Sequence, residues 1–127
     1  MTTTKKANKI TIDDILQKKK LGKDYSVFKS KFFGKEFELE TIKPSQLVEI
    51  MNSDEDEITR YCKLIYNSCP FFRQKELIEA LEAEIPYTTV SKAFGNNYAG
   101  LFEFGNFIME KYGFLDEETV NKVKKQF

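Results

Sequence analysis

A single proline divides the longest amphipathic stretch of the chain, Ile58 to Ile85, and this stretch constrains the fold most. Before Pro70, apolar residues recur at the spacing of one helix face: Ile58, Tyr61, Cys62, Ile65 and Cys69. Proline has no amide hydrogen to donate and disfavours helical backbone before it, so the first helix should end there. Beyond it, a second apolar stripe predicts another helix: Phe71, Ile78, Leu81 and Ile85. Neither helix can bury its stripe alone, so other segments must cover both.

The N-terminal third carries one helix signal and one hairpin signal. Residues 1–9 are polar and are predicted to form a disordered tail. Thr11, followed three residues later by Asp14, is typical of a capping box that opens a short helix. From about residue 25 to 42 the period changes to that of strands, and Gly34 suits the first position of a type II′ turn. We therefore expect a β-hairpin, whose apolar face must lie on the helices or whose edges must meet another chain.

Two features of the C-terminal part predict how its helices begin and pack. Ser53 and the acidic residues 54–57 are interpreted as the capped start of the central helix rather than as a cation-binding loop, because no calcium-loop glycine follows. Gly105 interrupts an apolar stripe that runs from Tyr98 to Tyr112, on a helix capped by Asn96 or Asn97. A glycine in mid-helix costs about 1 kcal/mol relative to alanine, so we expect another helix to approach it closely.

Together these signals predict one domain, residues 10–127, with an α+β fold that is mainly α-helical. A single N-terminal β-hairpin occupies about residues 25–42, and the helical part runs from about 44 to 127. We expect roughly five to seven helices, packed together with the hairpin. The last of them should run from Asp116 to Phe127.

Composition argues against several classes of function. Lys+Arg and Asp+Glu number 20 each, so the net charge is zero, whereas nucleic-acid binders carry a basic excess. The chain has no histidine, which excludes serine or cysteine catalysis through a histidine and mixed Cys/His zinc sites. Its two cysteines are interpreted as buried free thiols in a reducing compartment. No signal peptide or membrane span is visible. We therefore expect a cytoplasmic protein that is no enzyme and holds no cofactor or metal.

The phenylalanines are numerous, and three of them lie off the apolar stripes. The chain holds 12 Phe and no Trp. Phe107 falls nearly opposite the main stripe of its helix, Phe104 lies at the border, and Phe72 points away from the stripe of Phe71. Either the N-terminal segment or the terminal helix covers these rings, or they form an exposed site for another protein, since aromatics are enriched in interface cores. Phe72, Phe104 and Phe107 are thus the predicted partner-binding residues.

The order of elements resembles the XkdN-like phage tail assembly chaperones. Three stretches carry the resemblance: ITIDDILQKKK with the hairpin FKSKFFGKEFELETIKPSQLVEIM, then IYNSCPFFRQKELIEAL, and then YTTVSKAFGNNYAGLFEFGNFIMEKYGF. The resemblance implies a small, mainly helical protein of phage or prophage virion morphogenesis in the bacterial host cytoplasm. It would bind the tape-measure protein, keep it soluble during tail tube assembly and also meet the tail tube protein.

The resemblance supplies no catalytic residues, and two further questions stay open from the residues alone. Hairpin edges and zero net charge favour self-association, so a homo-oligomer is one expectation. The alternative function is a small non-enzymatic phage or bacterial adaptor, or a regulatory domain, that binds one folded partner. Neither reading involves nucleic acid or a membrane.

Overall fold

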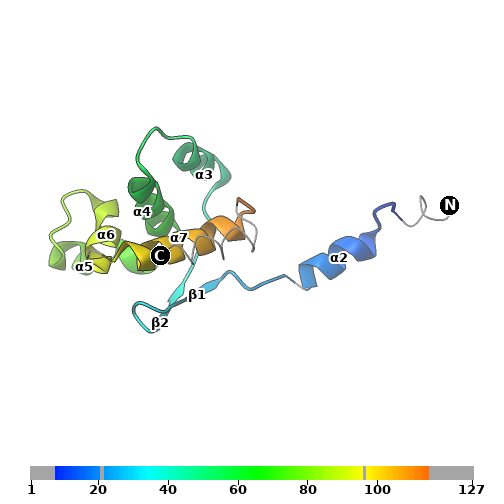
Figure 1. Cartoon of the computed structure of the whole chain (residues 1–127), viewed down its shortest axis with the longest axis horizontal. Helices are drawn as coiled ribbons and strands as arrows, with labels where there is room; N and C mark the ends of the chain where they lie inside the picture. The colour runs from blue at the N-terminus through cyan, green and yellow to red at the C-terminus, as the bar shows by residue number, and fades with distance from the viewer. Residues whose placement is uncertain (1–7, 21, 96, 115–127) are drawn as a thin grey trace.

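The computed structural model describes residues 8–20, 22–95 and 97–114, shown in colour in Figure 1. These residues form six α-helices, two 3₁₀ helices (η) and one antiparallel pair of strands. In chain order the elements are α2 (Ile12–Lys20), β1 (Val27–Ser30), β2 (Lys35–Glu38), α3 (Pro44–Met51), α4 (Glu57–Ser68), η1 (Pro70–Arg73), α5 (Lys75–Ala80), η2 (Pro86–Thr88), α6 (Thr89–Phe94) and α7 (Tyr98–Lys111). The predicted mainly helical α+β fold with an N-terminal hairpin is confirmed.

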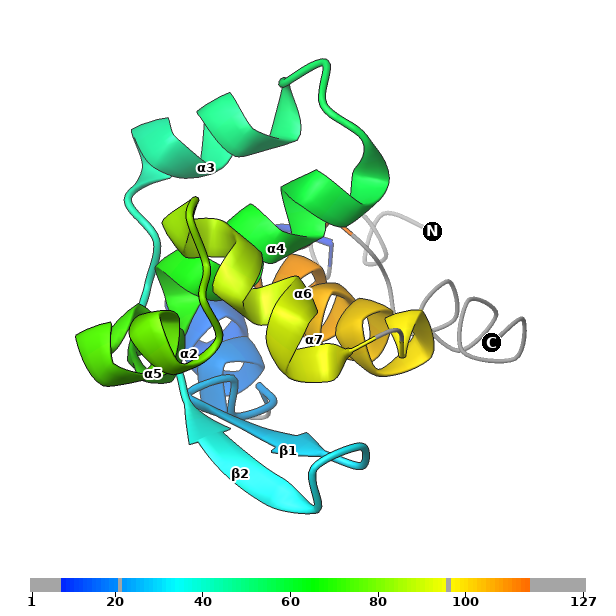
Figure 2. The same cartoon turned by 90° about the vertical axis from the view of Figure 1, so that its left-hand side faces the viewer.

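Helices α4 and α7 form the centre of the packed body, with α6 beside both. In Figure 2, α3 lies across the outer side of α4, and the hairpin lies beneath the helices. Helix α4 begins at an Asp56 cap, whose carboxylate accepts a hydrogen bond from the Thr59 amide at 2.7 Å. That bond lowers the pKa of the Asp56 carboxyl. The acidic run therefore caps the helix as predicted, although the capping residue is Asp56 and not Ser53.

Gly105 of α7 permits a close contact with α4. Its place within the apolar stripe of its helix predicts such an approach by another helix. A Cβ at this position would lie 2.8 Å from Cδ2 of Tyr61, closer than packed carbon atoms approach. The Tyr61 hydroxyl, which is buried, donates a hydrogen bond to Oδ1 of the buried Asn106 at 2.6 Å. Burial raises the pKa of Tyr61 to about 12. The missing side chain of Gly105 therefore makes room for the ring, and the hydroxyl of that ring satisfies a buried amide.

The hairpin forms in the predicted place, but its turn differs from the predicted one. Phe28 pairs with Phe37 and Ser30 with Lys35, which leaves a loop of four residues, 31–34. Gly34 is the last of these and has a positive φ of 64°, and its amide donates to the Ser30 carbonyl at 2.9 Å. The longer loop allows Phe33 to pack on Phe94 of α6, with ring centroids 5.0 Å apart. Tertiary aromatic packing thus replaces the expected type II′ turn.

The helix in the second half of the stretch Ile58 to Ile85 is shorter than the apolar stripe there predicts. After α4, Cys69 has extended backbone and the chain continues as η1 before α5 begins. Helix α5 ends at Ala80 with Glu82 at φ 54°, and the Ala83 amide donates to the Ile78 carbonyl at 3.0 Å. This is the hydrogen bond of a Schellman cap. The predicted continuous stripe to Ile85 is therefore wrong, and Ile85 is exposed.

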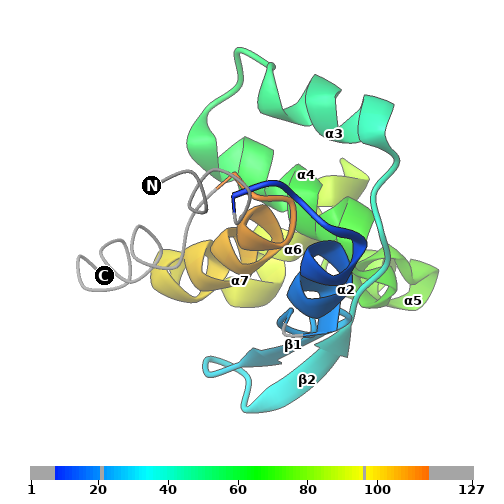
Figure 3. The same cartoon turned by 90° about the vertical axis from the view of Figure 1, so that its right-hand side faces the viewer.

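Helix α2 stands away from the packed body in Figure 1, and Figure 3 shows this helix nearly end-on, in front of the body. Its predicted capping box is confirmed, because the Thr11 amide donates to the Asp14 carboxylate at 2.9 Å and the Asp14 amide donates to Thr11 Oγ1 at 3.2 Å. Residues 1–7 of the predicted tail and the predicted helix 116–127 lie outside the described residues. Among the helices that the structure does describe, none has the length and apolar character needed to cross a bilayer.

Candidate functional site

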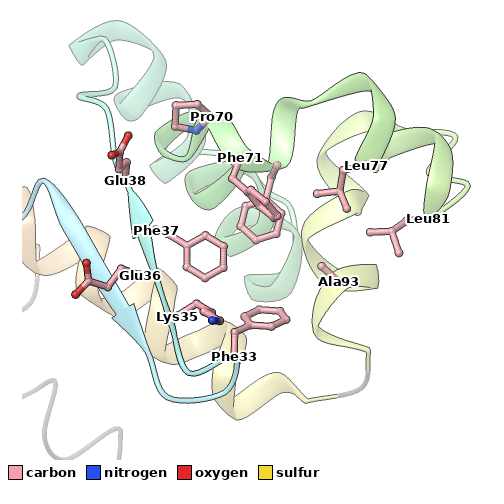
Figure 4. Close-up of a pocket in the computed structure, with 11 residues that line it drawn as sticks. Phe33, Lys35, Glu36, Phe37, Glu38, Pro70, Phe71, Leu77, Leu81 and Ala93 are labelled. Carbon is pink, nitrogen blue, oxygen red and sulfur yellow. The ribbon is translucent and has the colours of Figure 1, made fainter.

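An open groove of about 740 Å³ runs between the hairpin and the segment that follows α4. We call it the hairpin groove. It is lined by Phe33, Lys35, Glu36, Phe37, Glu38, Pro70, Phe71, Phe72, Leu77, Leu81 and Ala93. Most of its lining is apolar, and Figure 4 shows the rings of Phe33, Phe37 and Phe71 on one side with Leu77 and Leu81 on the other.

Phe37 of β2 is the centre around which the walls are built. Its ring lies 5.6 Å from that of Phe33 and 5.4 Å from that of Phe71, both in edge-on geometry. On its inner side it stacks on Phe72 at 5.5 Å and contacts Phe104 at 5.3 Å. Aromatic pairs at these distances and angles contribute beyond the area that they bury. The rings at the groove floor therefore belong to the aromatic core, and this packing holds the groove walls in place.

The far wall comes from α5 and α6, and the chain reaches it through η1. Pro70 opens η1, and Arg73 at its end donates to the Asn67 carbonyl at 3.0 Å and to Glu40 at 2.8 Å. These bonds hold η1 against the end of α4 and against the segment that follows β2. Leu77 packs against the core cluster from α5 and lines the groove, and Ala93 lines it from α6.

Charges of both signs lie on the hairpin rim of the groove. Lys35 begins β2 at the turn end, and Glu36 and Glu38 follow it, pointing outward from the ring cluster in Figure 4. Glu36 lies 4.0 Å from Lys29 across the hairpin, and both side chains are largely exposed. An exposed pair at this distance contributes little to stability, so the rim charges are available to a ligand.

Two of the three predicted partner-binding residues are buried in the core, which corrects the prediction for them. Phe72 and Phe104 are both fully buried, and their ring centroids lie 6.2 Å apart. The exposed neighbour is Phe71, at 46% exposure. The exchange of the buried and exposed positions between Phe71 and Phe72 has a physical cause. The segment η1 is a 3₁₀ turn with about three residues per turn, so the α-helical register assumed after Pro70 does not hold. Phe72 still lies beneath the groove, but a partner would touch Phe71.

Phe107, the third predicted residue, is partly covered by the segment before β1. Its ring lies 5.1 Å from Tyr25 and 5.1 Å from Phe28, and the Lys23 ammonium lies 5.6 Å from its centroid. The Tyr25 hydroxyl donates to Glu110 at 2.9 Å, which fixes that segment on α7. The segment before β1 thus covers part of the Phe107 ring, as one of the predicted alternatives has it. That Phe107 binds a partner stays a prediction. A hollow lined by apolar and charged side chains opens beside it.

Both cysteines are free and buried, as the sequence predicts. Burial raises the pKa of Cys62, and it raises the pKa of Cys69 to about 11. The thiolate is the reactive form of cysteine. These thiols are consequently packing groups at neutral pH, although Cys69 directly precedes the Pro70 wall of the groove.

Sequence reasoning did not find the groove, because its residues come from four separate elements, from the hairpin loop and from the end of α5. The one available signal was the adjacent pair Phe71 and Phe72 after Pro70, of which one ring had to face outward. The chain matches no protein-family model, no curated protein and no solved structure. The resemblance to the tail assembly chaperones therefore rests on the pattern of elements given above.

Proposed function

We propose that this chain is a phage or prophage tail assembly chaperone. Its client is the tape-measure protein, which it holds in the hairpin groove and keeps soluble in the bacterial host cytoplasm while the tail tube assembles. The tail tube protein is the second partner, because its polymerisation around the client must displace the chaperone. The observation that carries this proposal is the apolar groove with the exposed Phe71 on its wall.

The shape and chemistry of the groove suit an amphipathic helix. Helix-in-groove recognition places apolar side chains, spaced three or four residues apart, against a preformed apolar surface. Here such side chains would contact Phe33 and Phe71 on one wall and Leu77 and Leu81 on the other. A tape-measure protein is a long, apolar-rich helical chain, which offers many such segments.

The rim of the groove supports reversible binding to a repetitive client. Lys35, Glu36 and Glu38 give the rim both signs of charge, so client segments of either charge find a complement. The zero net charge of the chain adds no long-range repulsion between neighbouring copies on one client. Many copies can then coat one tape-measure chain.

The test is co-expression of this chain with a tape-measure protein from the same genome. We expect the tape-measure protein to be soluble with the wild-type chain and insoluble without it. Phe71→Glu should return most of the client to the insoluble fraction, because it places a charge on the apolar wall. The matched control is Val48→Glu, since Val48 is an apolar residue of α3 with 55% exposure that does not line the groove.

The outcomes separate the parts of the proposal. A client that is equally soluble without the wild-type chain would refute the chaperone function. A client that Phe71→Glu keeps soluble as well as wild type does would refute the groove as the binding surface. Capture of one compact folded protein, with no effect on the tape-measure protein, would favour the adaptor function instead.

A further inference from the structure

The arm formed by residues 8–20, which contains α2, carries an apolar face that nothing in the described structure covers. Ile10, Ile12, Ile15 and Leu16 are between 57% and 78% exposed. An isolated helix of nine residues is marginal in water, because helices shorter than about 12–15 residues rarely persist alone. The capping box supports the start of α2 but cannot replace packing. The arm therefore requires an apolar surface elsewhere.

We propose that the arm of one copy docks into the hairpin groove of a second copy. The groove is the surface whose character fits: it is apolar, open and lined by Phe33, Phe71 and Leu81 among others. Its volume of about 740 Å³ lies in the range of small-molecule sites, roughly 300–1,000 Å³, so it has room for apolar side chains from one face of a helix. Ile12, Ile15 and Leu16 share one face of α2 at the spacing that helix-in-groove binding uses.

One charge on the arm complements a charge on the groove rim. Asp13 lies in the first turn of α2, about 100° around the helix from Ile12 and so at the edge of the apolar face. Lys35 begins β2 and lies on the same face of the strand as Phe37, whereas Glu36 and Glu38 lie on the other face. An arm lying along β2 with its N-terminus at the turn end therefore brings Asp13 to Lys35.

In the described structure the arm points away from its own groove. Lys23 lies 3.4 Å from Glu110, and Tyr25 is bound to the same carboxylate, so the chain is fixed on α7 immediately after the arm. Three residue steps join Lys20 to Lys23 and span at most about 11 Å. β1 packs on α7, the groove lies along the opposite side of β2, and the arm leaves in a direction away from α5 and α6 (Figure 1).

The resulting contact is heterologous, with the arm of each copy in the groove of the next. Such contacts close into rings or continue as open chains. The inference does not depend on the identity of the client. In the absence of a client, the groove of each copy is covered by the arm of a neighbouring copy. A client helix must then displace that arm.

The test mixes one variant that has lost the arm contact with another that has lost the groove contact. Sedimentation of the wild-type chain at micromolar to high micromolar concentration should show concentration-dependent association. Leu16→Glu and Phe71→Glu should each raise the dissociation constant at least tenfold and sediment as monomers. Their equimolar mixture should form a complex of two chains, because one wild-type groove and one wild-type arm remain. Val48→Glu should associate like wild type.

Folding of each variant is checked by circular dichroism and by its thermal midpoint, and Leu81→Glu replaces Phe71→Glu if the latter does not fold. A wild-type chain that stays monomeric throughout would overturn the proposal, including the case of an arm that covers its own groove. Association of either single variant at wild-type strength would indicate another interface and would also overturn it. So would a mixture that contains only monomers.

Discussion

Helices α4 and α2 follow the same local rules, yet one is the centre of the core and the other is uncovered. Each begins at a side-chain cap, Asp56 for α4 and the Thr11–Asp14 box for α2. Each has an apolar face. The face of α4 is covered by α7, α6 and η1, whereas that of α2 is exposed. Local signals thus define a helix, but only the covering elements decide whether its apolar face stabilises the fold or remains available for binding.

The same contrast recurs between two adjacent residues. Phe72 stacks on Phe37 inside the core, and Phe71 contacts the same Phe37 ring from the groove. One side chain is fully buried and the other is 46% exposed. The ring of Phe71, like the apolar face of α2, therefore remains accessible to solvent in the described structure.

The largest expected effect is a difference in thiol reactivity between the two helices. Cys62 and Cys69 should be labelled at least about a thousandfold more slowly than in denaturant, because a thiolate forms there only on opening of the core, which costs several kcal/mol. Ile15→Cys on α2 should be labelled at the rate of a free thiol in dilute solution. The measurement is labelling by a thiol reagent, followed by mass spectrometry.

Raising the protein concentration should change the labelling of α2 but not that of α4. At high micromolar concentration, Ile15→Cys should become protected if the arm docks into a second copy, while Cys62 and Cys69 stay unchanged. Fast labelling of native Cys62 or Cys69 would show that α4 is not the rigid centre described above.

Truncation of the two adjacent phenylalanines should separate stability from binding. Phe72→Ala should lower the free energy of unfolding by about 3–5 kcal/mol, the usual cost of removing a buried ring. Phe71→Ala should lower it by well under half of that, because the ring is half exposed, yet it should weaken self-association. Urea unfolding measures the first quantity and sedimentation the second. Equal losses of stability from both variants would remove the distinction between core and groove.

The sequence predicts most of the helices because their signals are local. Pro44, the acidic run 54–57 and the Thr11–Asp14 pair each act near one helix start, and the apolar period of α4 is read directly from its residues, although the capping residue is Asp56 and not the predicted Ser53. The two cysteines follow from the same period. Gly105 was also interpretable, since a glycine inside an apolar stripe needs a neighbour at close range.

The groove could not be predicted because it depends on how the chain turns between elements. The extended Cys69 and the 3₁₀ turn of η1 exchange the roles of Phe71 and Phe72. The four-residue hairpin loop directs Phe33 to the groove wall, and Glu82 ends α5 before its apolar stripe does. Each of these depends on tertiary packing that local spacing does not encode.

A smaller effect is expected where α4 meets α7. Gly105→Ala should destabilise the protein by about 1–2 kcal/mol, because overpacking against Tyr61 outweighs the gain of about 1 kcal/mol that alanine brings to a helix. In a Tyr61→Ala background the same substitution should be stabilising, since the clash is gone. Unfolding of the four variants in urea gives this double-mutant cycle. The same sign in both backgrounds would contradict the close contact.

The smallest effects are expected at the caps, where they test whether the two helices are coupled to the fold. Asp56→Ala should lower the thermal midpoint of the body, because α4 is its centre. Thr11→Ala should reduce helical ellipticity and self-association without moving that midpoint, because α2 is covered by no part of the described body. A common fall in midpoint would show that α2 belongs to the cooperative unit.

The titration of Asp56 gives the cap of α4 a pH signature with a defined sign. Its hydrogen bond from the Thr59 amide lowers the pKa of the folded state below that of the unfolded state. The stabilisation is therefore present above the unfolded pKa of about 3.9 and is lost as the pH falls through the folded value. Asp56→Asn keeps an acceptor for Thr59 but does not ionise, so its midpoint should fall less than that of wild type between pH 7 and pH 3. A Thr11→Ala chain should retain the wild-type pH dependence, because its cap on α4 is intact. Identical acid sensitivity of Asp56→Asn and wild type would show that this carboxylate contributes nothing to the pH dependence of α4.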